Sequence, residues 1–398
     1  MQALYQSIGW QGKKRVSIPV LLFFLLPTIA VIAELARGRV NNFLIFKGVF
    51  WHTLQQQNLF AAYPAEYWDT NHYGPFFSIV IAPFAVLPLQ LGVVLWVVTN
   101  AFCLYRAAKE LPVAEKAFLG LLLIMAVENM TASHNLQSNA LVASWIIFSY
   151  TLVRKEKDFW AALFVVAGTL MKLYGVVGLL FFLFSKNKVR YLAGLVFWGV
   201  VCFCLPMLLS GPRFVVQSYF DWYASLAEKN ELNTSMEQSI SQDISFPGMV
   251  RRISGHLNFS GLWLLAPAGL LALLPLLRRQ LYGNTVYQLH YLALLLISVV
   301  IFSSSAESAT YVIAMAGVGI WFVQNNHRQH RWVVALLAFA IILTSLSPTD
   351  LFPKQFKRTY ITAYSLKALP CVLIWFAILG KLLLAPSNQF KSPQVHES

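Results

Sequence analysis

The stretch that decides the fold is FWAALFVVAGTLMKLYGVVGLLFFLFS, residues 159–185, in which Lys172 is the only charge. A lysine in the middle of such an apolar run costs about 3 kcal/mol on insertion scales, so it tends to serve a function. Basic residues flank the run on both sides, with Arg154, Lys155 and Lys157 before it and Lys186, Lys188 and Arg190 after it. Because basic flanks favour the cytoplasm, the run must enter the membrane and return. The pattern predicts a helical hairpin with Lys172 at its outer turn, where an ammonium can hold an anionic head group.

The composition of the whole chain is that of a membrane protein. Of its 398 residues, 58% are hydrophobic and 12% are charged, and the mean hydropathy is +0.61. About twenty apolar residues span a bilayer, and the chain has many such runs. We therefore predict an all-α polytopic membrane protein in which residues 1–398 form a single integral membrane domain. The four cysteines lie in apolar segments, so neither a disulfide nor a metal site is expected.

About twelve transmembrane helices are predicted, with both ends of the chain in the cytoplasm. The expected spans are 17–34, 90–105, 117–129, 139–153, 159–171, 173–185, 191–209, 262–277, 286–303, 309–323, 332–346 and 361–380. The first follows the basic residues Lys13, Lys14 and Arg15 and is interpreted as an uncleaved span rather than a signal peptide. Residues 90–209 hold spans that include the hairpin 159–185, residues 262–380 hold the C-terminal spans, and residues 381–398 form a cytoplasmic tail.

Two large loops are expected on the outer side. The first, residues 35–89, includes an amphipathic segment at 39–60 and a short proline-containing helix at 74–88, both interpreted as surface helices. The second is residues 210–261. With this topology most of the 30 Lys and Arg, but only a minority of the 16 acids, lie on the inner side, as the positive-inside rule expects. The net charge of +14 is thus a topology signal, and no nucleic acid partner is expected.

Polar residues gather in the outer loops, so we expect the chemistry there. Glu66, Asp69 and His72 lie within seven residues of one another, and a carboxylate or imidazole is what a general base requires. The alternative is a solvated polar loop. Gln137 and Asn139, between two spans, suit bonds to a sugar hydroxyl or a phosphate; the alternative is bonding between helices.

Two adjacent arginines, Arg251 and Arg252, lie in the second large loop. Arginine binds phosphate through two parallel hydrogen bonds, and adjacent residues on a helix point about 100° apart, so one can serve a site while the other stays solvated. The alternative for both, and for Lys172, is a cation that reaches the membrane interface without a ligand. Tyr174 is either a hydrogen-bond donor beside Lys172 or an interface aromatic.

The order of these motifs resembles that of the family 87 glycosyltransferases, which have the membrane-embedded C fold (GT-C) and use polyprenyl-phosphate sugars. The resemblance covers roughly residues 17–325. Its motifs are His72-Tyr73-Gly74-Pro75-Phe76-Phe77 continuing to Leu87-Pro88, then Gln137-Ser138-Asn139, Lys172-Leu173-Tyr174 and Gly248-Met249-Val250-Arg251-Arg252. Two positions depart from the family pattern. Asn42 stands where the family has an aspartate thought to be the base, and an amide cannot take a proton at neutral pH. Glu307 lies in a loop where the family often has a histidine.

The resemblance implies an inverting hexosyltransferase, for which mannose is one candidate sugar. It would act at the outer face, and we predict the bacterial inner membrane with a periplasmic site. The donor is a polyprenyl-phosphate sugar, the acceptor a lipid-linked or cell-envelope glycan or glycolipid, and membrane lipid surrounds the chain. Lys172, Tyr174, Arg251 and Arg252 would hold the donor phosphate. Asp69 is the first choice for the base and Glu66 the second.

Further residues are expected to bind substrate: Asn42, His72, Tyr73, Gln137, Asn139 and Glu307. No metal or other cofactor is expected, because lysine and arginine can neutralise the leaving group. Three alternatives stay open at this point. They are a polysaccharide polymerase or ligase that uses a diphosphate lipid, a non-enzymatic lipid-glycan transporter, and an inactive relative.

Overall fold

The protein is described by a computed structural model over residues 7–8, 16–234, 242–256, 258–325 and 330–390. A two-residue antiparallel pairing joins β1 (Ser7–Ile8) to β2 (Val16–Ser17). All other described elements are helices, which confirms the prediction of a helical chain. Three parts of the prediction lie outside the described residues: the basic residues 13–15, residues 235–241 of the second loop, and residues 391–398 of the cytoplasmic tail.

The helices follow the predicted spans closely. Those up to residue 234 are α1 (Ile18–Ala36), α2 (Asn41–Gln55), α3 (Phe77–Ala85), α4 (Leu89–Lys109), α5 (Glu115–His134), α6 (Asn139–Arg154), α7 (Asp158–Lys172), the 3-10 helix η2 (Tyr174–Phe184), α8 (Lys188–Cys204), α9 (Met207–Ser210) and α10 (Pro212–Thr234). Those after it are α11 (Phe246–Ser254), α12 (Leu262–Leu273), η3 (Leu274–Leu277), η4 (Arg279–Leu281), α13 (Thr285–Ile301), η5 (Ser308–Thr310), α14 (Tyr311–Asn325), α15 (Arg331–Phe339), η7 (Ala340–Leu346), α16 (Lys354–Phe356), η8 (Lys357–Thr362), η9 (Leu366–Ala368), α17 (Leu369–Leu384) and η10 (Ser387–Phe390). Each of the twelve predicted spans therefore contains a helix.

Five helical stretches among the described residues are long and apolar enough to cross a membrane by themselves. They are Ile18–Ala36, Leu89–Lys109, Glu115–His134, Lys188–Ser210 and Leu366–Leu384. The chain is thus a helical membrane protein, while the count of twelve spans and the GT-C architecture stay predictions. The last predicted span, 361–380, begins too early, because residues 357–362 form the separate helix η8 and the apolar stretch begins at Leu366.

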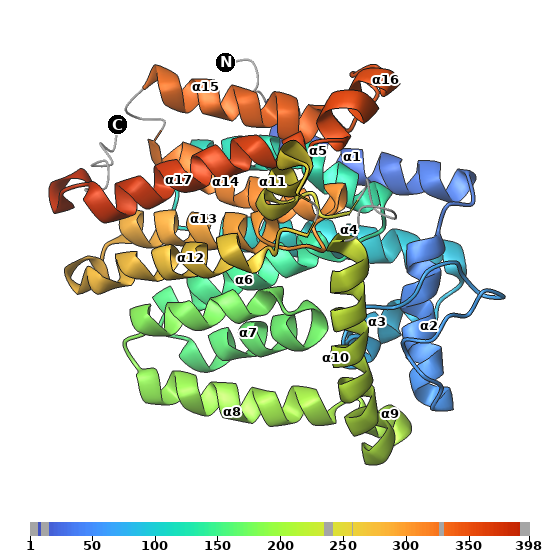
Figure 1. Cartoon of the computed structure of the whole chain (residues 1–398). Helices are drawn as coiled ribbons and strands as arrows, with labels where there is room; N and C mark the ends of the chain where they lie inside the picture. Colours follow the sequence, from blue (N-terminus) through green and yellow to red (C-terminus); the bar gives the residue numbers. More distant parts are fainter. Residues whose placement is uncertain (1–6, 9–15, 235–241, 257, 326–329, 391–398) are drawn as a thin grey trace. The chain divides into compact units, whose positions relative to one another are not determined.

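The structure has two helical arms in the run 159–185. Helix α7 ends where Leu173 adopts a left-handed conformation (φ +56°), and η2 returns alongside α7 (Figure 1). The two arms touch at Gly168 and Gly175, where a Cβ on Gly175 would come within 2.5 Å of the Gly168 backbone. The 15 residues of α7 rise about 22 Å at 1.5 Å per residue, and the 11 residues of η2 rise about 22 Å at 2.0 Å per residue. The tighter coil lets the shorter arm match the longer one.

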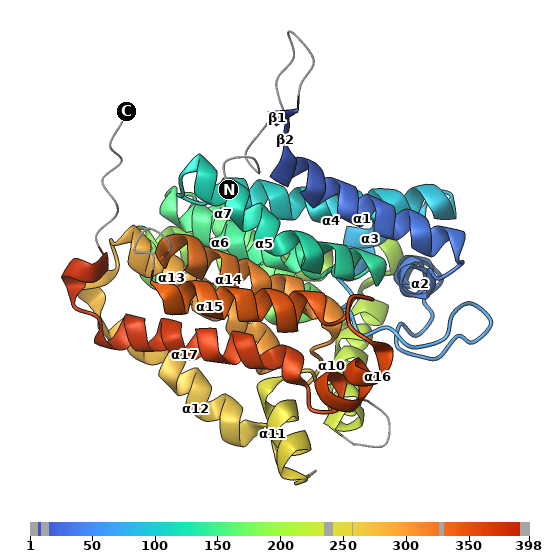
Figure 2. The same ribbon diagram turned by 90° about the horizontal axis from the view of Figure 1, so that it is seen from above.

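The contacts divide the chain into two compact units. The first unit comprises residues 21–111 and 129–231, and the second comprises residues 1–20, 112–128 and 232–398. In the first unit, α7 packs between α6 and α8 (Figure 1), and η2 packs against α6 and α7. In the second unit, α13 packs against α14 and α17, and α14 also contacts α15 (Figure 2).

Both predicted surface helices of the first loop exist, as α2 and the nine-residue α3. The apolar side of α2 is covered by the protein, since α2 packs on α3 and its residues Phe43, Phe46 and Val49 are at most 2% exposed. Two other apolar residues of α2, Trp51 and Leu54, are exposed. The second predicted loop likewise contains a 23-residue helix, α10.

Candidate functional site

Lys172 is the last residue of α7, and its ammonium lies among polar groups of the first unit. Its Nζ donates to Asn139 Oδ1 at 2.8 Å and lies 3.5 Å from the Tyr73 hydroxyl. The same nitrogen is 5.2 Å from the centre of the Tyr73 ring and 5.7 Å from that of Tyr174. The ammonium is only partly buried. Asn139, Tyr73 and Tyr174 therefore fix the position of this positive charge.

Tyr73 is fixed by contacts on every part of its side chain. Its hydroxyl donates to Gln137 Oε1 at 3.0 Å and accepts from Ser138 Oγ at 2.9 Å. Its ring stacks on Phe77 with the ring centres 4.4 Å apart. The next residue, Gly74, donates its backbone N–H to Met171 O at 3.1 Å. A Cβ on Gly74 would come within 2.1 Å of Leu170 O, so this close approach of the first loop to α7 requires glycine.

The turn between α5 and α6 supplies the other polar groups. Leu136 has a left-handed conformation (φ +54°), which reverses the chain between the two helices. The three residues that follow, Gln137, Ser138 and Asn139, all bond to Tyr73 or Lys172. The sequence had indicated Gln137 and Asn139, whereas Ser138 was missed because a serine between two helices ordinarily suggests only a cap.

Helix α10 closes the site beside His72. Trp222 Nε1 donates to His72 O at 2.9 Å, and the His72 Nδ1 to Ser225 Oγ distance is 3.1 Å. The pKa of His72 is lowered to about 4, mainly by burial and then by the nearby cations Lys229 and Lys172, while Asp69 opposes the shift. The imidazole is thus neutral at physiological pH. No local pattern in the sequence marks Trp222, Ser225 or Lys229, since 150 residues separate Trp222 from its partner.

Asp69 lies next to this cluster in a backbone conformation that is rare for its residue type. Its φ is +121°, it is exposed, and its Oδ1 accepts the N–H of Thr70 at 2.8 Å. The preceding residue is held by a bond from the Trp68 N–H to Asn41 Oδ1 at 2.9 Å. A non-glycine residue outside the usual φ range costs about 1–3 kcal/mol, and such strain collects at functional sites.

The other first-loop candidates have separate partners. Glu66 pairs with His52, whose Nε2 is 3.2 Å from Glu66 Oε2, and Asn42 donates to Asn135 O at 2.8 Å. A carboxylate that the sequence did not indicate, Glu34, pairs with His134 at 3.0 Å and is 4% exposed. The structure thus brings Lys172, Tyr174, Tyr73, Gln137, Asn139 and His72 together, with Asp69 close enough to affect the pKa of His72.

The first unit has a pocket of about 620 Å³ whose lining includes Thr169 and Leu170, near the end of α7. It is lined by side chains of α7, η2 and α8 that are almost all apolar. Two residues of its wall, Val165 and Thr169, lie on the same face of α7 as Lys172. Thr169 is four residues after Val165, and Lys172 is three residues after Thr169. The opposite wall includes Gly199, where an added Cβ would meet nothing within 4 Å.

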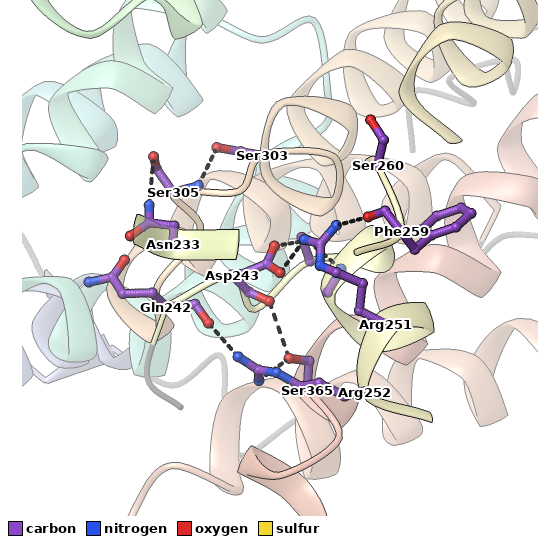
Figure 3. A network of polar contacts seen from close by, with 12 residues as sticks. Asn233, Gln242, Asp243, Arg251, Arg252, Phe259, Ser260, Ser303, Ser305 and Ser365 are labelled. Atoms are coloured by element: carbon purple, nitrogen blue, oxygen red, sulfur yellow. Dashed lines mark hydrogen bonds and ion pairs between the residues drawn. The ribbon is translucent and has the colours of Figure 1, made fainter. Parts of the chain in front are cut away.

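In the second unit, the predicted phosphate ligands Arg251 and Arg252 belong to a separate network of polar contacts (Figure 3). Arg251 is 3% exposed and pairs with Asp243, which is 4% exposed. Arg252 donates to Thr362 O at 3.0 Å, Gln242 O at 2.8 Å and Ser365 Oγ. Burial raises the pKa of Asp243 and lowers that of Arg252. These arginines therefore hold α11 to the polypeptide around it.

Two more charged residues of the second unit, Glu307 and Lys367, make polar contacts within it. Glu307 accepts from Gln242 Nε2 at 2.7 Å and caps the short helix η5 together with Thr310. Lys367, which sequence reasoning did not single out, is 4% exposed and donates to Glu128 Oε1 at 2.9 Å and to Ser308 Oγ at 2.9 Å. Its position at the start of an apolar span is a signal of the same kind as that of Lys172.

These features define a helical membrane protein with a cation, a neutral imidazole and amide groups gathered beside an apolar pocket. The family model for Glycosyltransferase family 87 matches residues 71–348, well over half of the chain. The chain therefore belongs to glycosyltransferase family 87, which confirms the resemblance. No curated protein matches it. The match includes Tyr73, Gln137, Asn139 and Lys172 but begins after Asp69, so the family assignment leaves the choice of base open.

Proposed function

We propose that this glycosyltransferase transfers a hexose from a polyprenyl-phosphate donor to a lipid-linked or cell-envelope glycan at the outer face of a bacterial inner membrane. The proposal depends mainly on one observation: the same face of α7 lines the apolar pocket and carries the Lys172 cation. The α7 face formed by Val165 and Thr169 lines the apolar pocket and ends at Lys172. An isoprenoid chain in the pocket would place its phosphate at the ammonium. The volume, about 620 Å³, lies in the range of about 300–1,000 Å³ typical of ligand pockets.

The hairpin length supports a site close to one membrane surface. Each arm rises about 22 Å, while the hydrocarbon layer is about 30 Å thick. If the basic flanks lie at the inner surface, Lys172 reaches the outer half of the layer. That is where the phosphate of a membrane-dissolved donor meets a glycan on the outer side.

In the proposed reaction, Asp69 takes the proton of the acceptor hydroxyl as its oxygen bonds to the anomeric carbon. The bond between that carbon and the phosphate oxygen breaks, its electron pair stays on the phosphate, and the configuration inverts. The donor phosphodiester carries one negative charge and the departing phosphate gains another. Lys172, held by Asn139 and Tyr73, stabilises this growing charge, and such preorganised groups lower the barrier. Arg251 and Arg252 are not part of this proposal, because their guanidinium groups bond within the second unit.

The test uses the purified protein in proteoliposomes with polyprenyl-phosphate mannose or glucose of long and short chain. Gly199→Trp adds a large ring on the pocket wall, at a position where an added Cβ meets nothing within 4 Å. We expect the ratio of kcat/KM for the long-chain donor to that for a two-isoprene donor to fall about tenfold. The matched control is Gly269→Trp on α12, where an added Cβ also meets nothing within 4 Å. A wild-type protein that uses only diphosphate lipid-linked sugars, or none, would refute the proposal.

A further inference from the structure

Helix α10 carries a cation that the proposed reaction does not use. Trp222, Ser225 and Lys229 are three and four residues apart, so they share one face of the helix. The first two bond to His72, at 2.9 Å and 3.1 Å. Lys229 therefore faces the same side as the His72 contacts, about 6 Å farther along the helix axis.

The direction of α10 shows on which side of the site Lys229 lies. Tyr219 stacks on Phe203, a residue of the pocket wall, with ring centres 4.6 Å apart. A Cβ on Gly74 would meet the Trp222 ring at 3.0 Å, next to the end of α7. The contacts of α10 thus follow a path from the pocket wall at Tyr219, to the end of α7 and His72 at Trp222, and then to Lys229 about two turns beyond. In the proposed orientation, the lipid chain lies at the beginning of this path and the acceptor at its end.

Two charged residues, Lys229 and Asp69, influence His72. Lys229 lowers the pKa of His72 more than Lys172 does, and Asp69 raises it. Lys229 and Asp69 are therefore both near His72. Among the described residues, no hydrogen bond or ion pair engages the Lys229 ammonium, and the side chain is only partly buried. A lysine in such a position can pair with an anion supplied by a ligand.

We propose that Lys229 binds an anionic group on the acceptor, so that the acceptor of this enzyme is a glycan or glycolipid bearing a phosphate or a carboxylate. The inference rests on the proposed function, because it takes Asp69 as the acceptor side and Lys172 as the donor side. With its anion on Lys229, an acceptor hydroxyl is positioned beside Asp69. Lys172 is left to the donor phosphate, so each substrate has its own cation.

The experiment compares three acceptors that differ only in charge: octyl glucoside, octyl glucuronide and octyl glucoside 6-phosphate. Transfer from a polyprenyl-phosphate hexose is measured in proteoliposomes, and binding of the same three compounds is measured without donor. We expect the wild-type protein to prefer one or both anionic compounds about tenfold in kcat/KM and in Kd. In Lys229→Gln this preference falls toward one, and in Lys229→Glu it reverses. The two anionic compounds distinguish a phosphate from a carboxylate.

Arg213→Gln is the matched control, since it removes a cation from the exposed beginning of the same helix. We expect it to keep the wild-type preference. Equal preference in wild type and Lys229→Gln, in both transfer and binding, would overturn the inference. Anion binding that depends on Lys229 without transfer of any hexose would instead refute the proposed function and keep the anion site.

Discussion

Replacing Lys172 by methionine tests the centre of the proposed site, because it removes the charge and keeps a similar apolar length. The lost contacts include the 2.8 Å bond to Asn139 and the cation over the Tyr73 ring at 5.2 Å. For stability the loss is small, about 0.5–1.5 kcal/mol for the hydrogen bond and about 0.5–1 kcal/mol for the aromatic contact. It is partly offset because the half-buried ammonium no longer has to be desolvated.

The expected loss of activity is much larger than the loss of stability. A preorganised group that stabilises developing negative charge contributes about 100- to 1,000-fold to kcat, or about 2.7–4 kcal/mol. We therefore expect kcat/KM of Lys172→Met to fall by about that factor in a proteoliposome assay with radiolabelled polyprenyl-phosphate hexose. Lys172→Arg keeps the charge but not the compact ammonium, so we expect an intermediate rate.

The matched control is Lys188→Met on α8. The Lys188 ammonium donates to Ser185 O at 3.0 Å and lies 5.5 Å from the Phe182 ring centre, so the same kinds of contact are lost away from the site. Its activity should stay within about threefold of the wild type. If Lys172→Met also stays within threefold while folding normally, Lys172 does not stabilise the leaving phosphate.

Three further predictions concern other parts of the chain. Asp69→Asn should lower kcat by about 100-fold or more, as loss of a general base does, whereas Glu66→Gln should have a small effect because Glu66 pairs with His52; comparable rates for both variants in the same transfer assay would exclude Asp69 as the base. Arg251→Met should lower the free energy of unfolding by about 3–5 kcal/mol, because it leaves the Asp243 carboxylate buried and unpaired; the check is thermal unfolding in detergent, with an unchanged melting temperature as the contrary result. Because the pKa of His72 is lowered to about 4 from its ordinary value of 6.5, the unfolded chain binds more protons between these values and stability should fall as the pH drops from about 6.5 to 4; His72→Gln should reduce that slope, and an unchanged slope would contradict the shift.

The charge pattern predicted the hairpin but not the form of its second arm. An apolar run with basic flanks must return to the side from which it came, and the turn indeed falls at Leu173. The pattern did not predict that the second arm is the 3-10 helix η2, whose 11 residues rise about as far as the 15 residues of α7. Nor did it predict the close approach of the two arms at Gly168 and Gly175.

The prediction for Arg251 failed to include a partner that was close in the sequence. Asp243 lies eight residues before it, and the two side chains meet in the interior of the second unit. Asp243 precedes the start of α11 at Phe246, so the pair joins the helix to the segment before it. The interpretation of these arginines as phosphate ligands considered only their outward chemistry.

By itself, the sequence determined that this is a helical membrane protein with a lone cation at the turn of a hairpin, because apolar runs and their charged flanks act locally and independently of packing. Only the tertiary structure decided what surrounds that cation. Tyr73 and Lys172 are 99 residues apart, and Lys172 and Asn139 are 33 apart. Contacts of this length depend on how whole helices pack, as with Gly74 against α7 and α10 against His72. The spacing of apolar residues within a single helix does not show which other helices it packs against.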